Sequence, residues 1–330
     1  MSPDLRRKFL WSLMFALLVY MALVLYGDWR ALRGVLADFP WAWLPAILGL
    51  TLVNYVGRLL KWHWYLRVLG TPISFRESAR IFGVAFVMVL TPGKVGEFTK
   101  AYMVRNVTGA PMARTAPVVL AERMTDGLAM LVLAGIGLFA FPATSARLTA
   151  AIALVALLGA ILVIQARPLA LWLLNLGHRL PLIGRYADRL HQFYESSYRL
   201  FRPRTLLISV AIGVLSWLGE GLAYFMVLWG MGVSPGADTV LAAVFIFSIS
   251  TVVGAVVATP GGLGGTEGSL VALSEQLLGM ARTPATAAAL LVRFATLWFG
   301  VAIGVVCLTL WPHLLTGKEE VVDAQIPAPR

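Results

Sequence analysis

Ionisable side chains interrupt apolar stretches of this chain, and their spacing indicates a shared site. Lys94, Glu97 and Lys100 follow one another at intervals of three, so a helix through them would carry all three on one face. Further charged residues stand in later apolar stretches: Glu122, Arg123, Asp126, Glu220, Glu267 and Arg293. A charge at membrane depth is costly unless it is paired or hydrated, so each of these residues is a candidate for function.

Two glycine-rich segments accompany the charges. Residues 91–97 read TPGKVGE, and residues 259–267 read TPGGLGGTE. A helix that restarts after such a break presents free N–H groups and the positive end of its dipole, which together bind anions such as phosphate. The backbone positions expected to do so are Pro92, Gly93, Gly96, Pro260, Gly261, Gly262 and Gly264.

Side chains near the breaks are suited to a phosphate-bearing lipid headgroup. Lys94 supplies a point charge, whereas Arg123 and Arg293 can each grip a phosphodiester with two parallel hydrogen bonds. The carboxylates expected to balance charge, hold an ammonium group or take up protons are Glu97, Asp126 and Glu267. The full set expected to bind the headgroup is Lys94, Glu97, Lys100, Glu122, Arg123, Asp126, Glu267 and Arg293.

A purely structural interpretation of the same residues stays open. Buried ion pairs can fasten two halves of a membrane protein together, for example Glu97 with Arg293 or Glu267 with Arg123. Both interpretations are compatible, because a transporter's site often lies at the interface of its repeats. Arg58 and Lys61, near the end of an apolar stretch, are expected to be membrane-surface residues that extend toward the headgroups.

The composition sets the environment in which these charges must work. Of the 330 residues, 59 % are hydrophobic and only 13 % are charged, with a mean hydropathy of +0.81. Soluble domains are near 45–50 % apolar and about 25 % charged, so a soluble enzyme, a coiled coil and a disordered chain are excluded. The net charge of +11 therefore indicates loops that face anionic lipid, and no nucleic-acid partner is expected.

Motifs for a cofactor are missing from the sequence. The single cysteine, Cys307, and the scattered four histidines offer neither a disulfide framework nor metal-ligand spacing, so neither a metal nor another cofactor is expected. The nucleotide-binding pattern G-x-x-x-x-G-K-[ST] does not occur, so ATP is not expected to drive the protein directly.

Long apolar stretches predict an all-α polytopic membrane protein with about six transmembrane helices. A span of about 20 apolar residues crosses the hydrocarbon core. The six predicted spans are residues 9–27, 41–62, 116–140, 148–166, 205–230 and 286–311. Two further stretches, 78–104 and 239–273, are broken by the glycine-rich segments and are expected to be broken helices or re-entrant hairpins.

The two broken stretches resemble one another. The tripeptide Thr-Pro-Gly at 91–93 recurs at 259–261, and Met-Ala-Arg-Thr at 112–115 recurs at 280–283, each 168 residues later. We therefore expect an inverted repeat within one membrane domain, 1–315. Its first copy covers about 41–140 and its second about 205–311.

Charge predicts the orientation. If both hairpins re-enter, 19 of the 27 basic residues fall in cytoplasmic segments and four outside, so both termini are expected in the cytoplasm. Whether the second hairpin re-enters or crosses stays open. The connector 167–204 is expected to be an amphipathic helix on the cytoplasmic leaflet, with an ordinary solvated helix as the alternative, and 316–330 a disordered tail.

These motifs together carry a resemblance. Residues 91–97, the Glu122-Arg123-x-x-Asp126 span, residues 260–267 and the later Arg293 resemble the lysylphosphatidylglycerol synthase transmembrane family, the flippase-like region that also occurs alone as UPF0104 membrane proteins. The upstream Arg58-x-x-Lys61-Trp62 fits as well. The resemblance implies a multi-pass protein of the bacterial inner membrane that moves an anionic, aminoacylated or isoprenoid-linked lipid between leaflets.

The resemblance also sets the limits of the expected activity. The soluble synthase domain of the bifunctional relatives is not expected here, so aminoacyl transfer is not carried over and the chain is not expected to be an enzyme. The alternatives are an intramembrane enzyme, an accessory subunit of lipid or hopanoid biosynthesis, and a transporter of a soluble solute. The expected partners are a membrane phospholipid or isoprenoid lipid and lipid-biosynthesis enzymes. The cargo, the energy coupling and the oligomeric state stay open.

Overall fold

The computed structural model is built from helices. It describes residues 29–137, 144–167 and 187–316 and five positions between 14 and 22, and among these there is no strand. Most of the predicted span 9–27, most of the connector before residue 187 and the tail after residue 316 lie outside the described residues. The predictions made for those segments therefore stay predictions.

Four helical stretches among the described residues are long and apolar enough to cross a membrane, as a multi-pass membrane protein requires. They are Trp41–Val68, Pro203–Gly230, Ala237–Val257 and Arg282–Leu310. Three of them confirm predicted spans. The predicted spans 116–140 and 148–166 correspond to the helices α6 (Met112–Gly137) and α7 (Thr144–Gln165), which are not among these four stretches. The predicted count of six spans is therefore not established.

Two of the four crossing stretches consist of more than one helical segment. The first crossing stretch comprises η1 (Trp41–Trp43) and α3 (Leu44–Val68), and the last comprises α14 (Arg282–Arg293), the π-helical turn η5 (Phe294–Trp298) and α15 (Phe299–Leu310). The second and third are α11 (Pro203–Gly230) and α12 (Ala237–Val257). The remaining elements are α2 (Trp29–Ala37), α4 (Phe75–Ala85), η2 (Phe86–Leu90), η3 (Pro92–Phe98), α5 (Thr99–Thr108), α10 (Ala187–Leu200), η4 (Pro260–Gly262), α13 (Gly265–Leu278) and α16 (His313–Thr316).

Both predicted breaks are present, and a threonine shapes each one. Thr91 and Thr259 have extended backbones, with φ/ψ of −80°/142° and −67°/160°, and a proline follows each. The Thr91 Oγ1 accepts a hydrogen bond of 2.8 Å from the Gly96 N–H, whereas the Thr259 hydroxyl donates to the Leu263 carbonyl at 2.7 Å. The helix does not resume directly after Gly93, because a 3-10 segment intervenes until α5 begins at Thr99.

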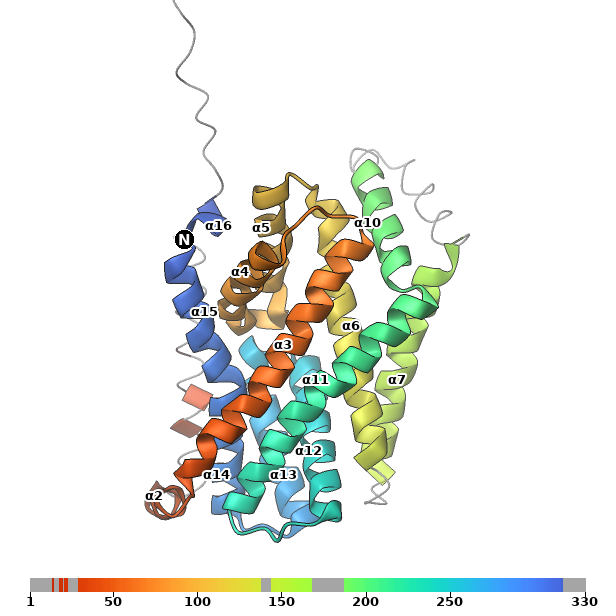
Figure 1. Cartoon of the computed structure of the whole chain (residues 1–330). Coiled ribbons are helices and arrows are strands. Elements are labelled where there is room, and N and C mark those ends of the chain that lie inside the picture. The colour runs from red at the N-terminus through yellow and green to blue at the C-terminus, as the bar shows by residue number, and fades with distance from the viewer. Residues whose placement is uncertain are drawn as a thin grey trace, which may run out of the picture.

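The two hairpins point toward each other. Figure 1 shows the first hairpin, α4 to α5, at the end of the molecule where α3 finishes, and α13 returning to the opposite end, where α12 begins. The segments at the two tips, η3 and η4, are in contact, as are η2 and η4. The tips share a small apolar cluster that contains Leu90, Leu263, Leu297 and Val301. The two glycine-rich breaks therefore meet inside the protein.

Two larger cores lie on either side of this meeting point. One is formed mainly by α11, α12, α13 and α14, and the other mainly by α3, α4, α5 and the first part of α6. The long helices α3 and α11 cross in close contact (Figure 1). A Cβ added at Gly57 of α3 would come within 2.0 Å of the Ser216 Oγ and 3.1 Å of the Ser216 Cβ of α11, so a side chain there would crowd the crossing.

The connector helix α10 packs against the helical bundle. Tyr194 and Leu200 are buried, and α10 packs mainly on α6. The Tyr194 hydroxyl donates to the Ile164 carbonyl of α7 at 3.2 Å, and burial with the nearby Glu195 raises the pKa of that hydroxyl. The described part of the connector is therefore a helix that packs against the bundle through this face, while Leu190 at its start is exposed. Its place relative to the membrane stays a prediction.

Candidate functional site

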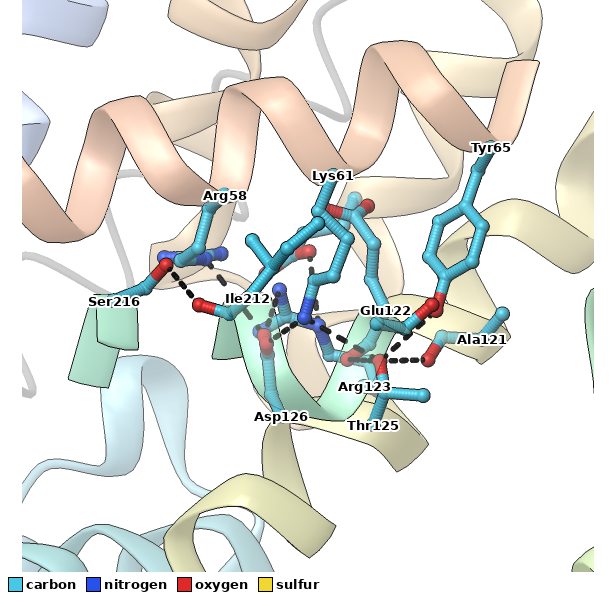
Figure 2. A network of polar contacts seen from close by, with 12 residues as sticks. Arg58, Lys61, Tyr65, Ala121, Glu122, Arg123, Thr125, Asp126, Ile212 and Ser216 are labelled. Carbon is cyan, nitrogen blue, oxygen red and sulfur yellow. Dashed lines mark hydrogen bonds and ion pairs between the residues drawn. The ribbon is translucent and has the colours of Figure 1, made fainter. Parts of the chain in front are cut away.

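Asp126 of α6 is the centre of the charged network in the first half. Its carboxylate forms a close ion pair with the Nζ of Lys61, whose side chain is fully buried. The Asp126 Oδ2 lies 3.2 Å from the Arg123 Nη2 and 3.7 Å from the Arg58 Nε. Figure 2 shows Arg58 and Lys61 pointing from α3 toward α6. One carboxylate therefore faces three cations.

A second pair lies beside this one and fastens the first hairpin to α6. The Lys100 Nζ of α5 donates to the Glu122 Oε2 at 2.5 Å and lies 3.7 Å from the Glu97 Oε2. The same ammonium group lies 4.7 Å from the ring centroid of Trp62, at cation–π distance. Both Lys100 and Glu122 are buried. These two predicted headgroup residues therefore hold the hairpin in place.

Arg123 connects the two groups but is held loosely. Its Nε lies 3.5 Å from the Glu97 Oε2 and its Nη2 lies 3.2 Å from Asp126, yet neither nitrogen makes a hydrogen bond within the part of the chain that the structure describes. Its side chain is 24 % exposed, compared with 4 % or less for both carboxylates. Its Nε and Nη2 are nevertheless buried donors whose hydrogen-bonding capacity is not used among the described residues.

Arg293 is fixed from two directions. Its Nε donates to the Glu267 Oε1 at 2.6 Å, and its Nη2 donates to the Gly261 carbonyl at 2.6 Å. The other oxygen of Glu267 accepts from the Gly264 N–H at 2.7 Å. The π-helical turn η5 follows Arg293 directly, a feature common near functional sites. The structure thus pairs Arg293 with Glu267 and Arg123 with Glu97. The structural interpretation of the sequence instead pairs Glu97 with Arg293 and Glu267 with Arg123.

A polar cavity, here called the chamber, lies where the hairpin tips meet. Its volume is about 70 Å³, enough for several water molecules or a phosphate-sized group. Three arginines and two glutamates line it, and aromatic and small residues complete the wall. The charged residues are Arg58, Arg123, Arg293, Glu97 and Glu220, and the others include Tyr55, Phe86, Trp217, Phe247, Gly261, Gly262 and Thr266. Guanidinium groups thus outnumber carboxylates on its surface.

A larger apolar cavity, here called the groove, adjoins the chamber. Its volume is about 400 Å³, and α6, α7 and α12 line it. Arg123, Thr251, Gly254 and Ala255 line both cavities. Asp126 joins Arg123 at the groove, and the rest of its wall is almost entirely apolar.

The predicted backbone anion sites need correction. The N–H of Gly96 donates to Thr91, that of Gly262 to the Thr259 carbonyl, and that of Gly264 to Glu267. Since these three amides already have partners, the expectation that they are free for an anion is wrong. At the second break, Gly261 instead offers its carbonyl to a cation. Gly261, Gly262 and Gly264 all have positive φ, which only glycine adopts readily.

Other predicted positions divide into three groups. Glu97, Arg123 and Arg293 line the chamber, and Asp126 lines the groove. Lys100, Glu122 and Glu267 instead pair with cations or anions behind those walls. Pro260 opens η4, whereas the surroundings of Pro92, Gly93 and Lys94 lie outside what the structure describes. The role expected of Lys94 therefore stays a prediction.

Arg58 and Lys61 belong to the network, so their interpretation as membrane-surface residues is wrong. Lys61 is fully buried, and Arg58 is 8 % exposed and lines the chamber. Arg58 also lies over the Trp217 ring at 5.6 Å. Their interval of three places both on one face of α3, a signal that the sequence carried.

Comparisons with known proteins agree with this architecture. Residues 9–304 match the family model described as the lysylphosphatidylglycerol synthase TM region. A UPF0104 membrane protein of Methanothermobacter thermautotrophicus is 25 % identical over 92 % of this chain and 93 % of its own length. A second UPF0104 membrane protein of that organism is 26 % identical over 78 % of this chain and 82 % of its own length.

Proposed function

Because the chain belongs to the lysylphosphatidylglycerol synthase transmembrane region family, we propose that it binds the phosphate-bearing headgroup of a membrane lipid in the chamber and moves that lipid between leaflets. The observation that carries the proposal is the gathering of Arg58, Arg123 and Arg293 around one small cavity. Guanidinium groups bind phosphate oxygens in a bidentate manner.

The network is arranged so that a phosphate can enter it. Arg123 has N–H groups without hydrogen bonds, whereas its two carboxylate neighbours have other cations close by: Lys100 for Glu97 and Lys61 for Asp126. When Arg123 turns to a phosphate, neither carboxylate is left without a cation. Arg293 stays fixed by Glu267 and forms the opposite wall.

The mixed charge of the chamber narrows the class of headgroup. Glu97 and Glu220 accompany the three arginines, so an ammonium group attached to the phosphate would also find a partner. Anionic, aminoacylated and isoprenoid-linked phospholipids are the proposed cargo class. The proposal assigns Lys94 as a further cation for the phosphate.

The architecture proposed for transport is an inverted repeat. The hairpins start from opposite ends (Figure 1), and each break begins with an extended threonine followed by proline. In this proposal six helices span the inner membrane of a bacterium, both termini are cytoplasmic, and the headgroup passes between the tips of the hairpins.

A vesicle assay tests this function. The purified chain is reconstituted into phosphatidylcholine vesicles that carry fluorescent phosphatidylglycerol, and a membrane-impermeant quencher reports how fast the probe exchanges between leaflets. We expect the wild type to accelerate exchange and Arg123→Ala to lower the rate about 10- to 100-fold, the value of charged hydrogen bonds. Arg76→Ala, which removes an exposed arginine from α4, is the matched control and should retain the rate.

Two outcomes of this assay contradict the proposal. One is a wild-type rate equal to that of empty vesicles for phosphatidylglycerol and for an isoprenoid phosphate probe. The other is equal loss of rate in Arg123→Ala and Arg76→Ala.

A further inference from the structure

The groove beside the chamber has the position and the chemistry of a site for hydrocarbon. Its wall is mostly apolar, with the charged side chains Arg123 and Asp126 and the hydroxyl groups of Thr251 and Thr259 as the polar positions. Its volume of about 400 Å³ falls within the range of small-molecule sites. Val256 on its wall is 77 % exposed, so this wall of a membrane protein faces the bilayer. The groove is therefore uncovered at Val256, where we expect lipid to reach it.

The groove and the chamber are parts of one amphipathic space. Arg123 lines both cavities, and so do Thr251, Gly254 and Ala255 of α12. A Cβ added at Gly254 would come within 1.9 Å of the Thr266 Oγ1, so this glycine lets α12 lie against the start of α13 at the junction of the two cavities. A phosphate in the chamber would thus stand directly beside apolar walls that lead to lipid.

We infer that one acyl chain of the cargo lipid lies in the groove between α6, α7 and α12 while its phosphate occupies the chamber. This inference rests on the proposed function, since the chamber must hold the headgroup. The acyl chain enters the groove from the bilayer past α7. The headgroup can therefore move into the protein while the acyl chain stays in an apolar environment. Arg123 is positioned at the boundary between the head and the tail.

Photocrosslinking tests the inference. The probe is phosphatidylglycerol with a diazirine in the middle of one acyl chain, bound to the full chain in detergent and mapped by mass spectrometry. We expect wild-type adducts on residues 127–131 of α6 and 251–258 of α12. Ala156→Phe, which fills the groove from α7, should lower these adducts and the affinity for the lipid about 15-fold. That value corresponds to excluding two methylenes at roughly fourfold each.

Matched variants separate a blocked groove from a damaged fold. Val155→Phe adds the same ring at the neighbouring position, where the side chain is 69 % exposed and does not line the groove, and it should leave the adducts unchanged. Val252→Phe fills the groove from α12 and should repeat the loss. The inference is overturned if the wild type binds the lipid and Arg123→Ala abolishes that binding, but the adducts lie on other helices. It is also overturned if such binding is found and neither filling variant lowers it. Absence of any binding that depends on Arg123 contradicts the proposed function itself.

Discussion

Arg123 and Arg293 each follow a glycine-rich break and line the same chamber, yet the protein holds them differently. Arg293 donates to a carboxylate and to a backbone carbonyl, both at 2.6 Å. Arg123 has two carboxylates at 3.2 and 3.5 Å but no hydrogen bond from its Nε or Nη2 within the described residues. The second half thus holds its arginine rigidly, whereas the first half holds its arginine by ion pairs alone. In the proposed function, Arg123 is therefore the cation that turns to the phosphate.

The largest effect is expected from removing the carboxylate that balances the first half. Asp126→Ala leaves Lys61 fully buried without its ion pair and takes a partner from Arg58 and Arg123. We expect the free energy of unfolding to fall by about 4 kcal/mol, measured by denaturant titration in mixed micelles. Asp238→Ala, at an exposed carboxylate of α12, is the control and should change it little. A loss similar to that of the control would show that Asp126 does not hold the cations of the first half together.

The second prediction addresses the rigid wall. Glu267→Gln keeps the shape but removes the charge opposite Arg293 and weakens the acceptor for the Gly264 N–H. We expect a loss of about 2 kcal/mol in the free energy of unfolding, in the range for hydrogen bonds to charged groups. Glu275→Gln, in the same helix near an exposed arginine, is the matched control. If both variants behaved alike, Arg293 would not be rigidly held.

The third prediction separates stability from transport. Arg123→Gln removes a loosely held cation, and both of its carboxylates have another cation nearby, so the free energy of unfolding should change by no more than about 1 kcal/mol. Exchange of phosphatidylglycerol in vesicles should nevertheless fall strongly. A large loss of stability together with normal exchange would reverse the roles assigned to Arg123 and Arg293.

The smallest effect concerns the backbone at the end of α12. Ala258 has a left-handed conformation with φ 56°, which costs a non-glycine residue about 1–2 kcal/mol. Ala258→Gly relieves that cost but adds freedom to the unfolded chain, so we expect a net gain of about 0.5 kcal/mol. Ala255→Gly, within α12, should instead destabilise the helix. A loss in Ala258→Gly would show that strain is not stored at the second break.

The sequence predicts the breaks because their causes are local. Proline removes a helical donor and glycine allows positive φ, so the two Thr-Pro-Gly segments interrupt their helices regardless of what surrounds them. Three predicted spans are also confirmed because hydrophobicity and length, which identify a span, are local properties of the sequence. The hydroxyl groups of Thr91 and Thr259 have different partners, the Gly96 N–H and the Leu263 carbonyl. Those partners depend on the turns that follow each motif, which the Thr-Pro-Gly sequence does not determine.

The partners of the charged residues were not predictable in the same way. Helical periodicity tells which residues share a face of one helix, but the rotation and depth of α3 relative to α6 decide that Lys61 meets Asp126. The span was predicted to end at Trp62, whereas α3 continues to Val68 and Trp62 is fully buried. That extension places Arg58 and Lys61 inside the protein. The apolar face of α10 was visible in the sequence, but the helix that covers it was not.

The buried pair of Lys61 and Asp126 also gives the biosynthesis of the protein a direction. The two residues are 65 positions apart, so α3 leaves the ribosome first and enters the bilayer with its cations unmatched. α6 follows with Glu122, Arg123 and Asp126, charges that oppose its release from the translocon into lipid. Electrostatic attraction between Asp126 and the cations of α3, already in the bilayer, offsets part of the cost of moving these charges into lipid. With α6 as one of the six predicted spans, we expect its insertion to depend on α3, the helix made before it.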